Sequence, residues 1–550
     1  MIVPMKHLDL LCLASEKEST LDSLRALGAV HLDLAAAQGA EVAEGKGLVA
    51  DAEKAVRLIR KYRKELPEGA WGSASFSGDL PGGVLELSDA IDSLKARAEQ
   101  LEREIRKYAP YGDFDPALAQ KLLDLGIDVG SVAELPEKLP ARRLSAMEAD
   151  LASMRSEMAA KSAEIAAADE RAVLALYPQL ADRVAFAAAK ELMSEQGAVA
   201  GISGWVPAPR VEAFRKAVAA NGWGALLRDP AEGELPPTLV EPPKLFRPMQ
   251  ALFAGLGIAP AYTEADVSVP FMCYFSLFFA MLVGDGAYGA IFLAGTLAAR
   301  KILPRSWFVL LTVFSSATVL WGVLSNTWFG APLPFLKHLP TVEWLGDPSY
   351  HNMMLLCFTI GVSHLMLARI WNGICRAPDS TCIAEFGWAG VLLFMYLVTN
   401  SIVGIFSGIP TWAYSVFGVS LVAVFGFSVK PRELKTRGAE LGMLPLNIMS
   451  ALGDIISYVR LFAVGLASVK VAENFNSMAT GLVSNENALW VNILMSVAMV
   501  AILVIGHGLN LAMAGLSILV HAVRLNTLEF SNHKGVSWAG YAFRAFKKNN

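Results

Sequence analysis

Residues 447–470 read NIMSALGDIISYVRLFAVGLASVK, an apolar stretch with a single arginine, Arg460, near its middle. A helix of this length can cross a hydrocarbon core about 30 Å thick. A charge at that depth costs about 3 kcal/mol or more, so an ionisable residue there marks function by default. A guanidinium stays protonated in nearly any environment. The segment therefore predicts a permanent positive charge inside a membrane.

Small residues share the helical face of Arg460, because they lie 3 and 7 residues from it on either side. They are Gly453, Ser457, Ala463 and Ala467. Such residues allow another surface to approach the guanidinium closely, so we expect Arg460 to face a partner. The alternative is a structural arginine that pairs with Asp454 or with a backbone carbonyl.

The whole chain has a charged half and an apolar half. Of its 550 residues, 54% are apolar and only 18% are charged, and most of the charged residues precede about residue 250. The net charge of −4 argues against a nucleic-acid-binding protein, which would need a basic face. The N-terminus lacks the basic, apolar and cleavage regions of a secretory signal. We therefore expect the N-terminal half in the cytoplasm.

The N-terminal half predicts short strands and long helices. Residues 3–12 and 29–35 resemble strands and 15–28 a helix, which suggests a βαβ-like unit, and a helix is expected around 46–66. Two further segments carry apolar seams at spacings of 3 and 4, which indicates antiparallel coiled coil. The seams are Ile91, Leu94, Ala98, Leu101 and Ile105, then Leu144, Met147, Leu151, Met154 and Met158.

A second α/β piece follows, with a strand at 198–207 and a helix at 208–221, and the proline-rich segment 232–248 reads as a linker. We therefore predict a cytoplasmic arm at 1–248, made of two small α/β lobes with coiled-coil segments. The remainder, 249–550, is the predicted membrane domain.

No catalytic chemistry is evident. The N-terminal half contains no P-loop, HExxH, GxSxG or kinase motif. The cysteines include no CxxC pair, so they indicate neither a zinc site nor a disulfide framework and are interpreted as small apolar residues. They are Cys12, Cys273, Cys357, Cys375 and Cys382. We expect no metal, no cofactor and no catalytic residue.

Seven apolar stretches fill the C-terminal half: 267–299, 304–328, 350–374, 383–407, 411–429, 444–474 and 488–526. One crossing for each stretch would put the basic loops near Lys301 and at 430–437 outside, against the positive-inside rule. The conflict disappears if 267–299 forms two short helices that turn at Gly284-Asp285-Gly286. We therefore predict a helical bundle of eight crossings, the last of them long and tilted.

The last apolar stretch carries a polar stripe. Asn510, Ser517, His521 and Arg524 recur at spacings of 7, 4 and 3, which places them on one helical face. A stripe of this kind needs water or protein beside it. We favour a hydrated path over hydrogen bonding between helices, and we include His507 among its candidate residues.

Two other intramembrane groups have simpler interpretations. The segment VGDGAYG, which contains Asp285, resembles part of a dinucleotide-binding fingerprint, but no strand precedes it. We expect a glycine turn with Asp285 capping the second helix. His364 in GVSHLMLA is a lone histidine, for which packing or hydrogen bonding is the usual role.

These motifs resemble those of a known family. SYVRLFAVGLA around Arg460 resembles the signature of the a/I subunit of V-type and archaeal A-type ATPases, and HAVRLNTLEF, with Arg524 and Glu529, resembles the last helix of that family. FFAMLVGDGAYG (278–289), GVSHLML, SGWVP and PKLFRP are similar to further segments in the same order. The resemblance extends over essentially the whole chain.

The resemblance implies a stator subunit that guides protons or sodium ions past a rotor proteolipid ring. Peripheral stalk subunits would hold its cytoplasmic arm, lipids would surround its eight helices, and ATP chemistry would belong to other subunits. Arg460 matches the arginine that faces the ring carboxylates, and Arg524 matches the second conserved arginine. The candidate ion-translocation residues are thus Asp454, Ser457, Arg460, His507, Asn510, Ser517, His521, Arg524 and Glu529.

The chain departs from eukaryotic members at two positions of the ion route. They carry a carboxylate where this chain has Ala514 and a histidine where it has Ser468. The short loops are typical of a bacterial or archaeal membrane protein. The rival interpretations are a secondary transporter of an anionic substrate, which would need internal repeats that the sequence lacks, and a membrane-anchored scaffold whose charges are structural.

Overall fold

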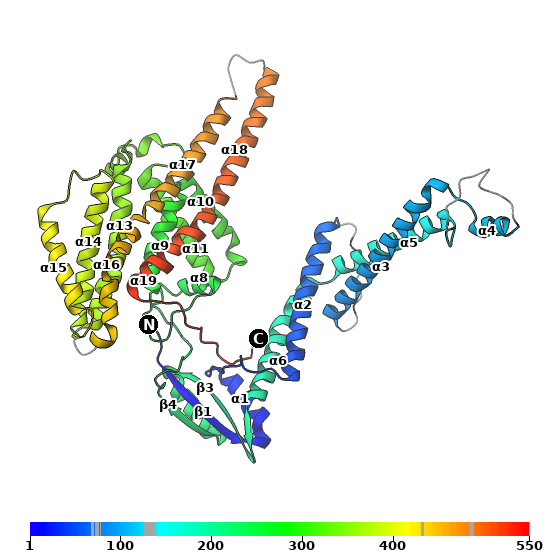
Figure 1. The fold of residues 1–550 in the computed structure, drawn as a ribbon, viewed down its shortest axis with the longest axis horizontal. Coiled ribbons are helices and arrows are strands. Elements are labelled where there is room, and N and C mark those ends of the chain that lie inside the picture. Colours follow the sequence, from blue (N-terminus) through cyan, green and yellow to red (C-terminus); the bar gives the residue numbers. More distant parts are fainter. Residues whose placement is uncertain are drawn as a thin grey trace. The chain divides into compact units, whose positions relative to one another are not determined.

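The computed structural model describes residues 1–67, 71, 76, 79–125, 139–430, 434–482 and 489–548, and it is mostly helical (Figure 1). The chain forms two compact units. We call Met5–Pro230 with Arg544–Asn550 the arm unit, and Met1–Pro4 with Ala231–Phe543 the bundle unit. Each is described by itself.

A small antiparallel sheet with the strand order β2-β3-β1-β4 forms one end of the arm unit (Figure 1). Residue Met5 of β1 pairs with Pro207 of β3, and His7 of β1 pairs with Arg228 of β4. The predicted βαβ-like unit is wrong, because β1 has antiparallel neighbours on both sides. The strands are β1 (Met5–Leu13), β2 (Ser194–Gln196), β3 (Val199–Pro207) and β4 (Gly224–Arg228).

The predicted strand at 29–35 is also wrong. This segment makes one isolated bridge, between His31 and Trp205, and no ladder. Its apolar pattern reflects burial, because Val30 and Leu32 lie in the core of the lobe beside Leu8 of β1. An apolar pattern reports which side chains are buried, and a segment can be buried without belonging to a sheet.

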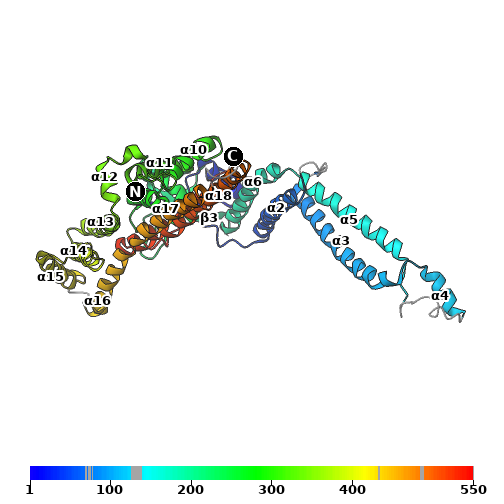
Figure 2. The same ribbon diagram turned by 90° about the horizontal axis from the view of Figure 1, so that it is seen from above.

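Helices cover this sheet and extend away from it. The lobe helices are α1 (Lys17–Leu27) and α7 (Val211–Asn221), which match the predicted 15–28 and 208–221. The long helices pack as two pairs, α2 with α6 and α3 with α5 (Figures 1 and 2). Their bounds are α2 (Ala40–Glu65), α3 (Leu80–Tyr108), α5 (Leu144–Ala167) and α6 (Glu170–Leu192), and a short α4 (Pro116–Asp124) lies between α3 and α5 in sequence.

The predicted apolar seams lie on the paired helices α3 and α5. Ile91, Leu94 and Ala98 of α3 are buried, as are Met147 and Leu151 of α5. Helix α6 was not predicted, because its mixed pattern has no clear seam. Supercoiling of the α3–α5 pair as a coiled coil stays a prediction.

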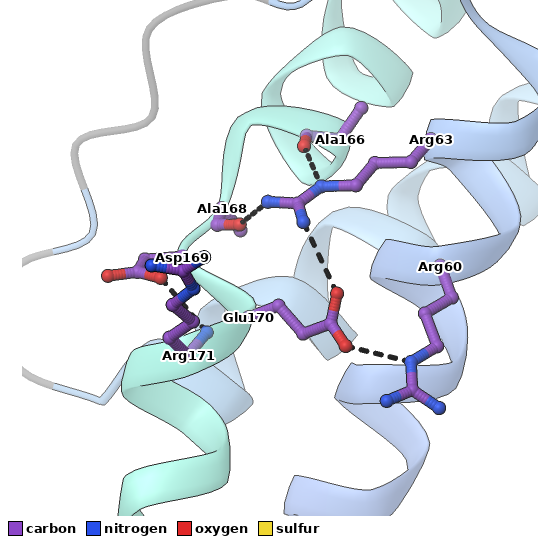
Figure 3. Close-up of polar contacts among 7 residues, drawn as sticks. All are labelled: Arg60, Arg63, Ala166, Ala168, Asp169, Glu170 and Arg171. Carbon is purple, nitrogen blue, oxygen red and sulfur yellow. Dashed lines mark hydrogen bonds and ion pairs between the residues drawn. The ribbon is translucent and has the colours of Figure 1, made fainter. Parts of the chain in front are cut away.

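An arginine clamp fastens the junction of α5 and α6 to α2 (Figure 3). Arg63 of α2 donates to the carbonyls of Ala166 and Ala168, at 2.8 and 2.7 Å, where α5 ends. The carboxylate of Glu170, in the first turn of α6, lies 2.8 Å from Arg60 and 3.2 Å from Arg63. Carbonyls at a helix end have no partner within the helix, so the clamp satisfies them and holds the junction in place.

The bundle unit begins with a sharply bent helix pair. Helices α9 (Ser268–Val283) and α10 (Gly286–Ala298) are bent by 119° at the Gly284-Asp285-Gly286 turn. Gly284 has a φ of 70°, a conformation that favours glycine. Asp285 accepts hydrogen bonds from the backbone N–H groups of Ala287 and Tyr288. The predicted turn and the predicted cap are both confirmed.

Among the residues that the structure describes, five helices of the bundle unit are long and apolar enough to span a membrane, or six if the bent pair forms one span. These five are Arg305–Ser325, His351–Arg376, Thr381–Ile402, Leu441–Thr480 and Ile493–Lys534. The eight predicted crossings stay a prediction. The last segment has 42 residues, which at about 1.5 Å per residue is about twice the thickness of a hydrocarbon core.

The core of the bundle unit forms around α9, whose Phe271, Phe275 and Phe278 are fully buried. The other helices are α8 (Met249–Leu256), α11 (Arg305–Ser325), α12 (Pro340–Leu345), α13 (His351–Arg376), α14 (Thr381–Ile402), α15 (Thr411–Phe427), α16 (Leu434–Ile456), α17 (Val459–Thr480), α18 (Leu489–Ser517) and α19 (Ser531–Lys534). Two π-helical segments, Ile518–Ala522 and Leu525–Phe530, join α18 to α19.

Candidate functional site

A two-residue break places Arg460 at the start of α17. Helix α16 ends at Ile456 and α17 begins at Val459, with Ser457 and Tyr458 between them. Tyr458 is fully buried, and its hydroxyl lies 2.9 Å from Nδ1 of His364 on α13. This contact anchors the break, and it confirms the hydrogen-bonding role expected for His364.

One buried carboxylate lies between the two predicted arginines. Oε1 of Glu529 is 3.6 Å from Nη1 of Arg460 and 3.5 Å from Nε of Arg524. It also lies 3.2 Å from the hydroxyl of Ser457. The sequence-based alternative, a pair between Arg460 and Asp454, is wrong, because Glu529 takes that place.

This three-charge group keeps unused hydrogen-bonding capacity. Nη1 of Arg460 and Oε2 of Glu529 are buried and have no hydrogen-bond partner among the described residues. A single carboxylate balances only one of two guanidinium charges, so the group keeps a net positive charge. Buried groups left in this state usually signal a strained or functional site.

The helix around Arg524 departs from α-helical geometry. Arg524 lies between the π-helical segments Ile518–Ala522 and Leu525–Phe530. Such segments have wider turns and are frequent at functional sites. The wider turn changes which side chains share a face, so a stripe predicted with α-helical spacing cannot run straight through this region.

The predicted stripe divides accordingly. Asn510 is buried and donates to the carbonyl of Ser468 at 2.8 Å and to the hydroxyl of Tyr288 at 3.0 Å. At this position the structure contains hydrogen bonds between helices, which was the alternative to a hydrated path. Ser517 and His521 are half-buried and make no side-chain hydrogen bond to any residue that the structure describes.

A second polar group lies on α10, α17 and α18. Nδ1 of His507 is 2.7 Å from the hydroxyl of Tyr288, and its Nε2 is 3.1 Å from Oδ1 of Asn476. Together with Asn510 and Ser468, these side chains form a continuous hydrogen-bonded network. The sequence pointed to His507 and Asn510, whereas Tyr288 and Asn476 became recognisable only from the fold.

A third polar group surrounds Asp454, and sequence reasoning missed most of it. His533 of α19 has its Nε2 3.0 Å from Oδ2 of Asp454 and its Nδ1 3.0 Å from Nε of Arg369. Arg369 also contacts Glu385 at 3.2 Å, and Arg376 lies 2.7 Å from the same carboxylate. Arg369 and Glu385 are ionisable residues within apolar stretches, which was the signal that could have identified them.

Among the described residues, no group of three or more His, Cys, Asp or Glu side chains could hold a metal ion. All five cysteines are free, and Cys12 and Cys357 are buried. The long apolar helices and buried charges of the bundle unit define an integral membrane protein.

Known proteins give this class a name. The chain is 36% identical to V-type ATP synthase subunit I of Borreliella burgdorferi over 63% of its length, and it covers 60% of that protein. It is 28% identical to V-type ATP synthase subunit I 1 of Treponema pallidum over the full length of both chains. A-type ATP synthase subunit I of Methanocaldococcus jannaschii is 26% identical over 83% of this chain and 68% of that protein. No family model matches.

The chain is therefore homologous to subunit I of V-type and A-type ATP synthases, over its full length with one relative and over part of its length with others.

Proposed function

We propose that this chain is the membrane stator of a rotary ATPase and that it carries protons or sodium ions between the two membrane faces and a rotating ring. Its homologues are subunit I of V-type and A-type ATP synthases, so we take it to be a membrane subunit of such a complex and not the subunit that turns over ATP. The observation that carries the proposal is the buried Glu529 between Arg460 and Arg524, which leaves a net positive charge inside an apolar bundle.

Arg460 provides the charge that the ring must pass. A carboxylate on a rotor subunit is neutral while it faces lipid, because it is protonated or has bound sodium. Near Arg460 the ionised form is favoured, so the ion is released. The desolvation cost of the pair keeps the attraction from becoming a trap. Glu529 is the counter-ion of Arg460 when no ring carboxylate is present, and the two carboxylates compete for it.

Polar groups on both sides of Arg460 supply two separate half-channels. Ser457 and Asp454, which precede Arg460 in the chain, lead toward the cytoplasm. Ser517 and His521 precede Arg524 on the last helix and therefore lie on the other side, with Asn510 and His507. These residues lead toward the opposite face. Because Arg460 lies between the two sets, it prevents ions from passing directly from one to the other. Rotation of the ring is then the only route, which couples transport to rotation.

The exposed surface of the last helix supports ring contact. In the most apolar 18 residues of Ile493–Lys534, only 11% are buried, compared with 56% in the corresponding part of Thr381–Ile402. Large apolar residues such as Val497, Val504 and Leu516 are more than half exposed. A helix of this kind needs lipid or another apolar helix beside it.

The remaining features concern topology and support. We propose eight crossings, because the confirmed turn at Gly284-Asp285-Gly286 allows both basic loops to lie inside. The arm unit then lies in the cytoplasm of a bacterial or archaeal cell. Its paired helices and the Arg63 clamp suit it to bracing, with peripheral stalk subunits as partners.

Purification of the tagged chain from its own membranes tests this function. A small, very apolar subunit with one carboxylate in mid-membrane should copurify, together with peripheral stalk and nucleotide-binding subunits. The Arg460→Ala variant should retain the same partners and serves as the control for assembly. A chain that purifies alone, under conditions that keep other rotary complexes intact, would contradict the proposal.

A further inference from the structure

We infer that His533 and Arg369 are positioning residues that hold Asp454 as an ionised ion acceptor on the cytoplasmic half-channel. The inference rests on the proposed function, because it assigns a role within that ion path. Neither residue was among the sequence-based candidates. The three side chains come from α19, α13 and α16, and hydrogen bonds link them directly.

The hydrogen-bonding partners fix the protonation state of His533. A guanidinium can only donate, so the contact from Nε of Arg369 requires Nδ1 of the imidazole to be an acceptor. The ring proton is then on Nε2, which lies 3.0 Å from Oδ2 of Asp454. His533 is therefore a neutral donor aimed at an ionised carboxylate. Such an arrangement stabilises the carboxylate without adding a charge of its own.

The surroundings prevent this histidine from moving. Its carbonyl accepts from Nδ2 of Asn372 at 3.0 Å, and Oδ1 of Asn372 accepts from the ammonium of Lys534 at 2.6 Å. Only 5% of the His533 side chain is exposed. Arg369 is itself held, since its guanidinium lies 5.0 Å from the ring of Trp388 and contacts Glu385.

The charges that face His533 are thus Asp454 from α16, Arg369 from α13 and Glu385 from α14, with Lys534 next to it in α19. Arg376 pairs with Glu385 on the far side of Arg369. Arg369 and Arg376 together carry one more charge than Glu385 balances, and Arg369 places that positive charge beside the His533–Asp454 pair. No described group competes with His533 for the Oδ2 atom of Asp454.

Asp454 keeps one oxygen open toward the ion path. Its side chain is 26% exposed, and Oδ1 has no hydrogen-bond partner among the described residues. One turn later, the hydroxyl of Ser457 lies 2.9 Å from the carbonyl of Asp454 and 3.2 Å from Glu529. The carboxylate can accept either a proton or a sodium ion, and for both it must be ionised.

The test is the pH profile of ATP-driven transport in inverted vesicles, where the cytoplasmic face is outside. His533→Leu removes the donor, so the ionised carboxylate loses a hydrogen bond. The acidic limb of the profile should move to higher pH, by about one unit. His533→Gln restores an amide donor and should return the limb toward its original position. His338→Leu, in the exposed loop before α12, is the matched control and should change nothing.

A purely structural role predicts something else. It would lower the rate at every pH and leave the limb in place, and that result would overturn the inference, as would an unchanged profile. If His533→Leu does not assemble, Asp454→Asn gives the second test. It should abolish transport at all pH values, and normal transport would overturn the inference.

Arg460→Ala, measured in parallel, separates this inference from the proposed function. An inactive Arg460→Ala variant together with an unshifted His533→Leu profile would reject the inference alone. Normal transport by Arg460→Ala would reject the function itself.

Discussion

The guanidinium of Arg460 shares the carboxylate of Glu529 with Arg524. This arrangement explains how a permanent charge can exist in an apolar bundle that has no rotor ring beside it. The carboxylate lowers the cost of burial, but its 3.5–3.6 Å distances leave room for a stronger partner. A ring carboxylate at hydrogen-bonding distance would be such a partner.

Individual residues of this site were predictable, but their partners were not. Arg460 and Arg524 stood out because charges are rare in apolar segments. The choice of Glu529 over Asp454 as the partner of Arg460 depends on how the last helix packs and on its π-helical turns. Spacing along one helix contains no information about these features. His533 was missed because it lies after the last apolar stretch, outside the segment in which a charged or polar residue stands out.

His31 gives a residue-scale prediction in the arm unit. Burial lowers the pKa of its imidazole, and its Nδ1 lies 2.9 Å from the backbone N–H of Arg544. The unfolded chain has the ordinary pKa of about 6.5, so unfolding takes up a proton once the pH falls below that value. This contribution to stability is full above pH ~6.5 and is lost as the pH falls toward the folded-state pKa.

Acidification from pH 7.5 to 5.5 should therefore open the lobe more often in the wild type than in His31→Gln, which cannot titrate. The buried Cys12 of β1 reports opening through its rate of reaction with a thiol reagent. The comparison uses a chain in which Cys273, Cys375 and Cys382 are serine. An equal pH response in both proteins would show that His31 does not contribute.

At the scale of elements, the turn between α9 and α10 illustrates what sequence patterns determine. The positive-inside rule required two helices in 267–299, and the glycines indicated where the chain turns. The strand expected at 29–35 shows the opposite case, because burial and sheet pairing give the same apolar pattern. Helix α6 was missed because its buried residues do not form a distinctive apolar seam; they are Val173, Asp182, Ala188 and Ala189.

Helices α10 and α11 cross at two glycines, which gives an element-scale prediction. A Cβ on Gly322 would lie 2.1 Å from Cα of Gly286, closer than any real contact. Gly322→Ala must therefore force the helices apart, and overpacking of this kind costs about 1–3 kcal/mol or more.

Gly418→Ala in α15 is the matched control, because a Cβ there meets nothing within 4 Å. It should be neutral or slightly stabilising, by up to about 1 kcal/mol. Thermal unfolding in detergent, followed by exposure of the buried Cys357, compares the two variants. Equal stability of Gly322→Ala and the wild type would mean that this close crossing is absent.

At the scale of the whole molecule, composition alone divides the sequence into a charged half and an apolar half. Charged residues need water, and long apolar helices need lipid, so the two kinds of segment separate. The all-antiparallel sheet was not visible, because β1 pairs with β3 and β4, which lie about 190 to 220 residues further along the chain. The contribution of the C-terminus to the lobe was not visible either. Phe546 belongs to a core that is formed mainly by the first half of the chain.

The stator mechanism depends most on Arg460. We expect Arg460→Ala to remove ATP-driven ion transport in proteoliposomes, down to the level without ATP, in a complex of normal subunit composition. Arg460→Lys should also be badly impaired, since an ammonium lacks the planar fork and can lose its proton when desolvated. Arg524→Ala should cause a smaller loss, because its side chain is 55% exposed and shares Glu529 from the edge of the site. Normal transport by a fully assembled Arg460→Ala complex would contradict the stator mechanism.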